Sequence, residues 1–134
     1  MNGEEKIMHR SRLAGFIIDC DTDDLDEAAE FWAKALGYAK SCSDDPDERD
    51  YAMLETPDDE VHIEVQKVSH SSRLHLDIET DDIEAEVGRL EKLGAKRIKK
   101  IKRWWVMEAP TGQRFCIVNP TRRDFESKAT AWED

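Results

Sequence analysis

Hydrophobic and polar residues alternate along several short stretches of this chain, and such alternation predicts β-strands. The clearest stretch is Val61–Val68, where Val61, Ile63 and Val65 point to one side of the strand. In the stretch 73–79 the apolar residues again occupy every second position. We expect further strands at 13–20, 38–42, 51–54, 96–101, 104–108 and 113–118.

Two other stretches place their apolar residues at helical spacing. The stripe in 25–36 consists of Leu25, Ala28, Ala29, Trp32 and Leu36, and the stripe in 83–93 consists of Ile83, Val87 and Leu90. Each stretch follows a Thr-Asp-Asp sequence, whose short side chains accept hydrogen bonds from the first backbone N–H groups of a helix. Each ends at a glycine that suits the left-handed position after a helix, so two helices are predicted.

These elements occur twice in the same order. Aligned without gaps, Thr22-Asp23-Asp24-Leu25 falls on Thr80-Asp81-Asp82-Ile83. The sequence therefore predicts an α+β fold of two βαβββ modules, about 12–68 and about 73–119, within one domain that has arms at 1–11 and 120–134. The second arm is expected to dock through Phe125 or Trp132. A single module leaves one face of its sheet uncovered, so two modules related by a pseudo-two-fold axis should close around a central cavity.

Charge is unevenly distributed along the 134 residues, which carry 31 Asp+Glu and 20 Lys+Arg. Residues 1–70 hold 19 acidic and 7 basic side chains, whereas residues 71–134 hold 12 and 13. A strongly negative field disfavours nucleic acid and anionic membranes as partners. The basic run 96–103 fits a solvated edge strand, in which lysines prevent pairing with other strands. We therefore expect neither a nucleic-acid nor a membrane partner.

Three cysteines, Cys20, Cys42 and Cys116, form no Cys-x-x-Cys motif, which indicates free thiols in a reducing compartment. The first residues contain no apolar segment typical of a signal peptide, and no apolar run approaches the ~20 residues of a membrane span. The expected location is therefore cytoplasmic.

Three local sequences resemble a known family. The pattern Asp-x-Asp followed by Ala-x-Phe-Trp-x-x-x-Leu-Gly spans Asp19–Gly37, His-Leu-Asp at 75–77 precedes Leu-Gly-Ala at 93–95, and Ala109–Cys116 forms a closing turn and strand. Over about 12–119 the chain resembles glyoxalase-like domains of the vicinal oxygen chelate (VOC) superfamily. That superfamily includes glyoxalase I, bleomycin-resistance proteins and extradiol dioxygenases.

The resemblance implies a divalent metal, which enzymes of this superfamily typically bind through four side chains. The matching positions here are Ile17, Glu64 (or Gln66, one register step away), His75 and Cys116. Ile17 cannot ligate, and a thiolate in place of a carboxylate suits softer ions such as Zn²⁺. No cofactor is therefore favoured; if a divalent metal binds, Glu64 and His75 are its expected ligands.

His75 is the strongest candidate for contact with a ligand. It lies opposite Leu74, Leu76 and Ile78, so it points into the cavity if those residues pack under the helices. Its imidazole suits ligand contact, general-base chemistry or a residual metal site, whereas the alternative is a histidine hydrogen-bonded in a polar lining.

Other candidates share the inward faces of the predicted strands. Glu64 shares a face with His62 and Gln66, and its carboxylate with an imidazole could hold a metal or form an acid–base pair; the alternative is a solvated or salt-bridged sheet face. Asp77 and its repeat partner Asp19 also face inward, and we interpret both as hydrogen-bonded near the helix caps. Trp104 and Trp105 point to opposite sides, and the sequence does not decide which of them stacks on a ligand. The predicted ligand-binding set is His75, Glu64, Asp77, Gln66, Trp105 and Cys116.

Three functions fit these observations. The favoured one is a glyoxalase-like protein that binds a small organic ligand in the cavity, without a firmly held metal. The alternatives are a metal-dependent lyase, isomerase or dioxygenase of the VOC type, and a partner-binding module that uses the acidic first half. Because a fold does not determine a function, the sequence leaves open whether the chain is an enzyme and identifies no catalytic residue. The resemblance also implies a homodimer.

Overall fold

The computed structural model describes residues 7–133, which form three α-helices and nine β-strands. The predicted α+β class is confirmed. The chain divides into two compact units, one of residues Gly15–His75 and the other of residues up to Ala14 together with residues from Leu76 onward. The division falls inside strands β1 (Ile7–Asp21) and β5 (Arg73–Thr80), so both units share these two continuous strands.

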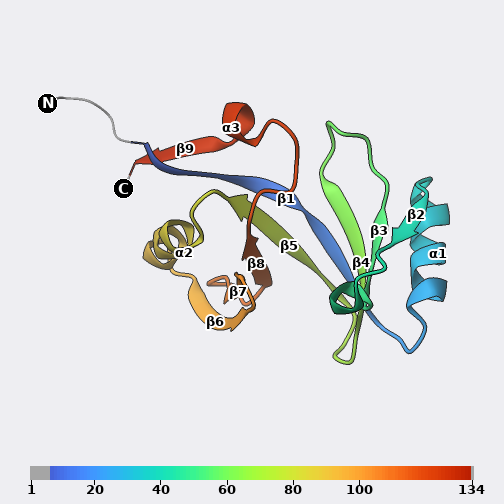
Figure 1. Cartoon of the computed structure of the whole chain (residues 1–134). Helices are drawn as coiled ribbons and strands as arrows, with labels where there is room; N and C mark the ends of the chain where they lie inside the picture. The colour runs from blue at the N-terminus through green and yellow to red at the C-terminus, as the bar shows by residue number, and fades with distance from the viewer. Residues whose placement is uncertain (1–6, 134) are drawn as a thin grey trace, which may run out of the picture. The chain divides into compact units, whose positions relative to one another are not determined.

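The unit Gly15–His75 contains one helix packed on a small sheet (Figure 1). The sheet order is β2-β3-β4-β1, with β4 parallel to β1 and antiparallel to β3. Besides parts of β1 and β5, its elements are α1 (Leu25–Leu36), β2 (Lys40–Cys42), the 3₁₀ turn η1 (Pro46–Glu48), β3 (Tyr51–Leu54) and β4 (His62–Val68).

Helix α1 begins and ends where its capping residues predict. Asp24 accepts a hydrogen bond from the Glu27 backbone N–H at 3.0 Å, and Gly37 closes the helix at φ 81°. The helix buries Ala29 of the predicted stripe, together with Ala33, against a core that also contains Ala52, Leu54 and Val65, whereas Leu36 of the stripe is exposed. The face of the sheet that packs against this core is therefore apolar, and different residues form the face that points away from α1.

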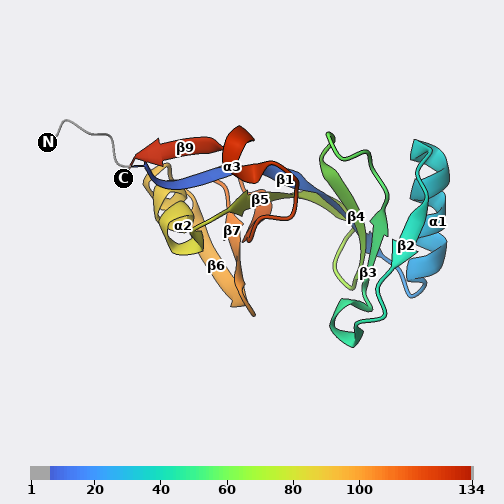
Figure 2. The same cartoon turned by 45° about the horizontal axis from the view of Figure 1, so that its top comes forward.

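The second unit repeats the strand–helix–three-strand order (Figure 2). Its sheet order is β5-β8-β7-β6, and β5 runs parallel to β8. Helix α2 packs over a core of Val87, Leu90, Met107, Phe115 and Ile117. The elements not yet given are α2 (Ile83–Lys92), β6 (Lys96–Ile101), β7 (Trp104–Glu108), β8 (Arg114–Val118), α3 (Phe125–Lys128) and β9 (Thr130–Glu133).

The structure differs from the sequence prediction at the two arms. Residues 7–11 are part of β1 rather than a loose arm, because His9 and Ser11 are buried polar residues with partners inside the unit. Residues 1–6 lie outside the described range. The tail docks through both expected aromatic residues: Phe125 is buried, and the Trp132 indole N–H donates to Ser11 Oγ at 2.8 Å. Strand β9 pairs antiparallel with β1.

Each unit thus contains the predicted βαβββ order, whereas the pseudo-two-fold relation, the module ranges and the enclosed cavity stay predictions. Among the helices formed by residues 7–133, none is long and apolar enough to cross a membrane.

Candidate functional site

The sheet of the unit Gly15–His75 has a polar face on the side away from α1. Val65 belongs to the core beneath α1, so its neighbours Glu64 and Gln66 on β4 point to the other side. The parallel register places Ile17 beside Glu64 and Asp19 beside Gln66. The Gln66 side-chain amide donates to Tyr51 Oη at 3.0 Å. The structure therefore brings Glu64, Gln66 and Asp19 together on one face.

A buried carboxylate holds His75 in a defined orientation. His75 Nδ1 lies 2.8 Å from Asp19 Oδ2, and the side chains are 13% and 2% exposed. Because an ionised carboxylate only accepts, Nδ1 carries the shared proton and the lone pair of the neutral ring is on Nε2. Such carboxylate–histidine pairs fix the orientation of the ring and its tautomer.

This pair corrects our interpretation of Asp19 as a residue bonded near a helix cap. The N–H groups at the start of α1 are already served by Asp24, so Asp19 is available to His75 instead. Burial raises the pKa of the adjacent Cys20 thiol; a contact with Trp32 opposes this shift, and the nearby charge of Asp19 adds to it. Cys20 therefore stays protonated and is a poor nucleophile.

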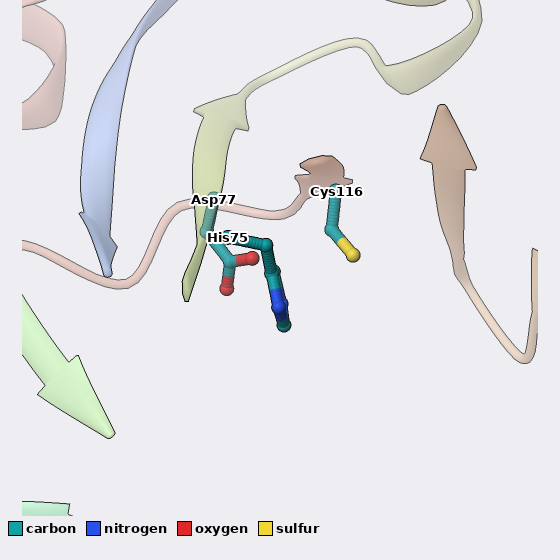
Figure 3. A group of neighbouring side chains, drawn as sticks. All are labelled: His75, Asp77 and Cys116. Atoms are coloured by element: carbon teal, nitrogen blue, oxygen red, sulfur yellow. The ribbon is translucent and has the colours of Figure 1, made fainter. Parts of the chain in front are cut away.

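His75, Asp77 and Cys116 form a group of neighbouring side chains (Figure 3). His75 and Asp77 are two residues apart on β5, and Asp77 is the register partner of Cys116 on β8. One nitrogen, one carboxylate oxygen and the sulfur all lie within 4.8 Å of one another. Three of the sequence-predicted site residues are thus close together.

These residues reproduce only part of the set of metal-ligating side chains that is typical of the superfamily. Ile17 is 4% exposed and offers no ligand atom at the position of the first ligand. The donors that do lie together are one imidazole, one carboxylate and one thiol, a combination that suits Zn²⁺ better than Mg²⁺ or Ca²⁺. If a metal binds here, His75, Asp77 and Cys116 would hold it, and it would act as a Lewis acid.

Trp105 does not join this group, contrary to the sequence prediction. Its indole N–H donates to Glu84 Oε2 at 3.1 Å, and its ring packs against the core beneath α2. Val106 is the register partner of Cys116, so Trp104, two residues away, shares the Cys116 face and Trp105 does not. Met107 is apolar and lies on the same side of the strand as Trp105. That pattern could have indicated that Trp105 faces the core.

Leu74 and Leu76 also differ from expectation, since they are 63% and 42% exposed. The core beneath α2 includes Ile78 but neither of these leucines, so only the last of the three apolar residues on β5 packs under a helix. The orientation of His75 therefore rests on its hydrogen bond to Asp19 rather than on the packing of these leucines.

Comparison with known proteins supports the same family that the residues suggested. A family model described as "Glyoxalase-like domain" matches residues 16–118. No curated protein matches the chain in sequence. Among solved structures, a hypothetical protein from Bacillus halodurans has a TM-score of 0.63 at 13% identity, covering 85% of this chain and 98% of the other.

A methylmalonyl-CoA epimerase from Streptomyces coelicolor, solved in complex with 2-nitronate-propionyl-CoA, has a TM-score of 0.57 at 15% identity, covering 84% of this chain and 99% of the epimerase. A glyoxalase/bleomycin resistance protein/dioxygenase superfamily member from Vibrio splendidus has a TM-score of 0.45 at 19% identity, covering 80% and 98%. At such identities the first two likenesses bear on the fold alone.

Proposed function

Because the chain belongs to the glyoxalase-like domain family, we propose that it binds a small organic ligand beside the His75–Asp19 pair, without a firmly held metal ion. The observation that carries this proposal is the 2.8 Å contact between Nδ1 of His75 and Oδ2 of Asp19. Burying a carboxylate costs free energy, so its use to orient one imidazole favours a functional role for that imidazole.

The pair would act on a ligand through the second ring nitrogen. In the neutral tautomer set by Asp19, Nε2 accepts a hydrogen bond or takes up a proton from a bound molecule. Asp19 would then stabilise the imidazolium that forms, because the carboxylate lies in direct contact with Nδ1. The same geometry therefore serves binding alone or acid–base catalysis, and a measured turnover would separate the two.

A ligand of the kind bound by the epimerase is not expected to bind this chain well. A coenzyme A thioester carries several negative phosphate charges, whereas the unit Gly15–His75 contains 17 acidic and 5 basic side chains. Like charges repel, so a polyanionic ligand would meet an unfavourable field around this unit. The favoured ligand is accordingly a small molecule without phosphate groups.

Thermal unfolding with a panel of small aromatic and carboxylated metabolites tests the proposal. Ligands that bind the folded state raise the melting temperature, and His75→Ala should abolish the increase. His70→Ala is the matched control, since His70 is exposed and its ring contacts the Ser71 carbonyl and the Arg73 side chain. A panel extended to amines and alcohols that gives no increase at all would contradict the proposal and favour the partner-binding module.

A metal-dependent lyase, isomerase or dioxygenase is the second candidate, supported by the proximity of His75, Asp77 and Cys116. Elemental analysis of purified protein separates the two candidates. We expect less than stoichiometric Zn, Fe, Mn or Ni. About one ion per chain, lost in both His75→Ala and Cys116→Ala, would contradict the first proposal and favour the second.

We further propose a cytoplasmic location and a homodimer. All three cysteines are free thiols, as a reducing compartment would keep them. Leu74 and Leu76 supply exposed apolar surface that an interface could cover. Light scattering of the purified protein, compared with a Leu74→Ser, Leu76→Ser variant, tests the homodimer.

A further inference from the structure

Three carboxylates are buried in the part of the chain that the structure describes, namely Asp19, Glu79 and Glu86. Buried carboxylate oxygens normally accept hydrogen bonds, because leaving one without a donor costs free energy. The three residues can therefore be compared by asking what each oxygen accepts.

Glu79 and Glu86 are both saturated with donors, and each contacts an arginine. Glu79 accepts from the backbone and side chain of Thr121 through Oε1 and from Arg12 through Oε2, the latter at 2.6 Å. Arg89 makes a bidentate contact with Glu86, donating one hydrogen bond to each carboxylate oxygen, and both N···O distances are 2.8 Å. In this molecule a buried carboxylate is thus compensated by a guanidinium and by N–H or O–H donors on both oxygens.

Asp19 is compensated less completely than Glu79 and Glu86. Its Oδ2 accepts from His75, but Oδ1 is buried and accepts from none of the residues between positions 7 and 133. Arg73 forms an ion pair with Asp19, but its Nε lies 3.7 Å from Oδ2 and its side chain is nearly half exposed. That separation is too long for a hydrogen bond. Asp19 therefore retains one acceptor oxygen without a donor, and its contact with an arginine is a long, partly exposed ion pair.

We infer that the ligand of this site is a small organic cation, an amine or a guanidine, that donates an N–H group to Asp19 Oδ1. This inference rests on the function proposed above and specifies the class of its ligand. Such a molecule would supply what Arg12 supplies to Glu79 and Arg89 to Glu86, a positive charge together with a hydrogen-bond donor.

The charge of the surrounding unit also favours a cationic ligand. The unit that contains Asp19 has 17 acidic and 5 basic side chains, so its field concentrates cations. Glu64 and Gln66, on the same face as Asp19, add acceptor oxygens beside it. A carboxylate ligand would offer acceptors to a site that already has them in excess.

Matched probes test the inference. Benzylamine, benzyl alcohol and benzoate, together with their cyclohexyl counterparts, share carbon skeletons and differ in the polar group. Melting temperature and titration calorimetry at neutral pH should show binding in the order amine, alcohol, carboxylate. Asp19→Asn should weaken amine binding about tenfold or more, as expected for loss of a charge-assisted hydrogen bond. Asp23→Asn, the same charge change at an exposed position, should change it less than about twofold.

The outcomes distinguish this inference from the proposed function. Tighter binding of carboxylates than of amines, or equal effects of Asp19→Asn and Asp23→Asn, would overturn the inference and leave the proposed function in place. Failure of all three series and of the metabolite panel would overturn both. If Asp19→Asn does not fold, NMR of the unmodified protein decides: amine titration should shift the His75 ring signals, and unchanged signals would overturn the inference.

Discussion

Gly15 on strand β1 lies directly against the backbone of the neighbouring strand β4. A Cβ atom added there would lie 2.1 Å from the carbonyl oxygen of His62 on β4. The backbone of Gly15 has no positive φ, so the requirement for glycine comes from space and not from conformation. Because this oxygen belongs to the backbone, it cannot move away as the end of a flexible side chain could.

We predict opposite effects of alanine at two glycines. Gly15→Ala should destabilise the protein by about 1–3 kcal/mol or more, since the strands must separate to admit the methyl group. Gly88→Ala in α2 should stabilise it by about 0.5–1 kcal/mol, because nothing lies within 4 Å of the added atom and alanine favours helix. Urea denaturation of both variants measures the difference, and equal effects would contradict the packing at Gly15.

Some site residues followed from the sequence and others required the structure. Alternation and the family resemblance together predicted that His75, Asp77 and Cys116 share a face, and the structure places their side chains close together, because strand periodicity fixes which residues share a face. The bond between His75 and Asp19 joins residues 56 positions apart, and periodicity carries no information about which strands are neighbours. Trp105 was misplaced because two adjacent tryptophans satisfy either face equally well.

At the scale of elements, helix α2 is tied to β1 and β9 by a buried polar network. Glu86 on α2 accepts from His9 on β1 at 2.8 Å and from Arg89, whose guanidinium lies 3.8 Å from the ring centroid of Trp132 on β9. Burial alone would raise the pKa of Glu86, but the hydrogen bonds from Arg89, His9 and Ser11 outweigh it and hold the pKa below its ordinary value of 4.5.

This network predicts a specific acid sensitivity. A carboxylate whose pKa is lower in the folded state than in the unfolded state adds stability above the unfolded pKa, and that stability is lost as the pH falls through the folded pKa. Glu86→Gln should therefore lower stability at neutral pH and reduce its loss between about pH 5 and pH 3. Urea denaturation across this range measures the slope. Glu126→Gln, at an exposed position, is the control and should retain the wild-type slope.

The same network explains which elements the sequence missed. The helix predicted at 25–36 has those bounds, and that predicted at 83–93 ends at Lys92, because caps and apolar stripes are local signals. The first part of β1 and strand β9 are instead held by His9, Ser11 and Trp132 together with charged residues of α2. Polar residues in a short segment normally indicate an exposed chain. A segment whose polar residues are buried in pairs is therefore predicted from the sequence, wrongly, to be a loose arm.

At the scale of the whole molecule, the two units differ sharply in charge. The unit Gly15–His75 has 17 acidic and 5 basic side chains, whereas the remaining residues have 14 and 15. Repulsion among like charges opposes folding of the first unit and is screened by salt. In the second unit salt screens attractive pairs instead, such as Arg97 with Glu84 and Glu91.

Salt should consequently act with opposite signs on the two units. Raising sodium chloride from about 0.01 M to about 1 M shortens the screening length from ~30 Å to ~3 Å. We expect slower hydrogen exchange in peptides from 25–68, and unchanged or faster exchange in peptides from 83–118. Hydrogen-exchange mass spectrometry reports both ranges in one experiment. Equal protection of both ranges by salt would contradict a charge-based origin.

The pairing of β9 with β1 has a consequence for the connectivity of the chain. Ile7 and Glu133 are register partners on adjacent antiparallel strands. Neighbouring strands lie about 4.7–4.9 Å apart, so a linker of a few residues can join these two positions. The chain can then be opened at an exposed turn such as the one at Asp59, which gives a circular permutant with the same strands in a new sequential order. The order in which the elements are synthesised is thus separable from the way they pack.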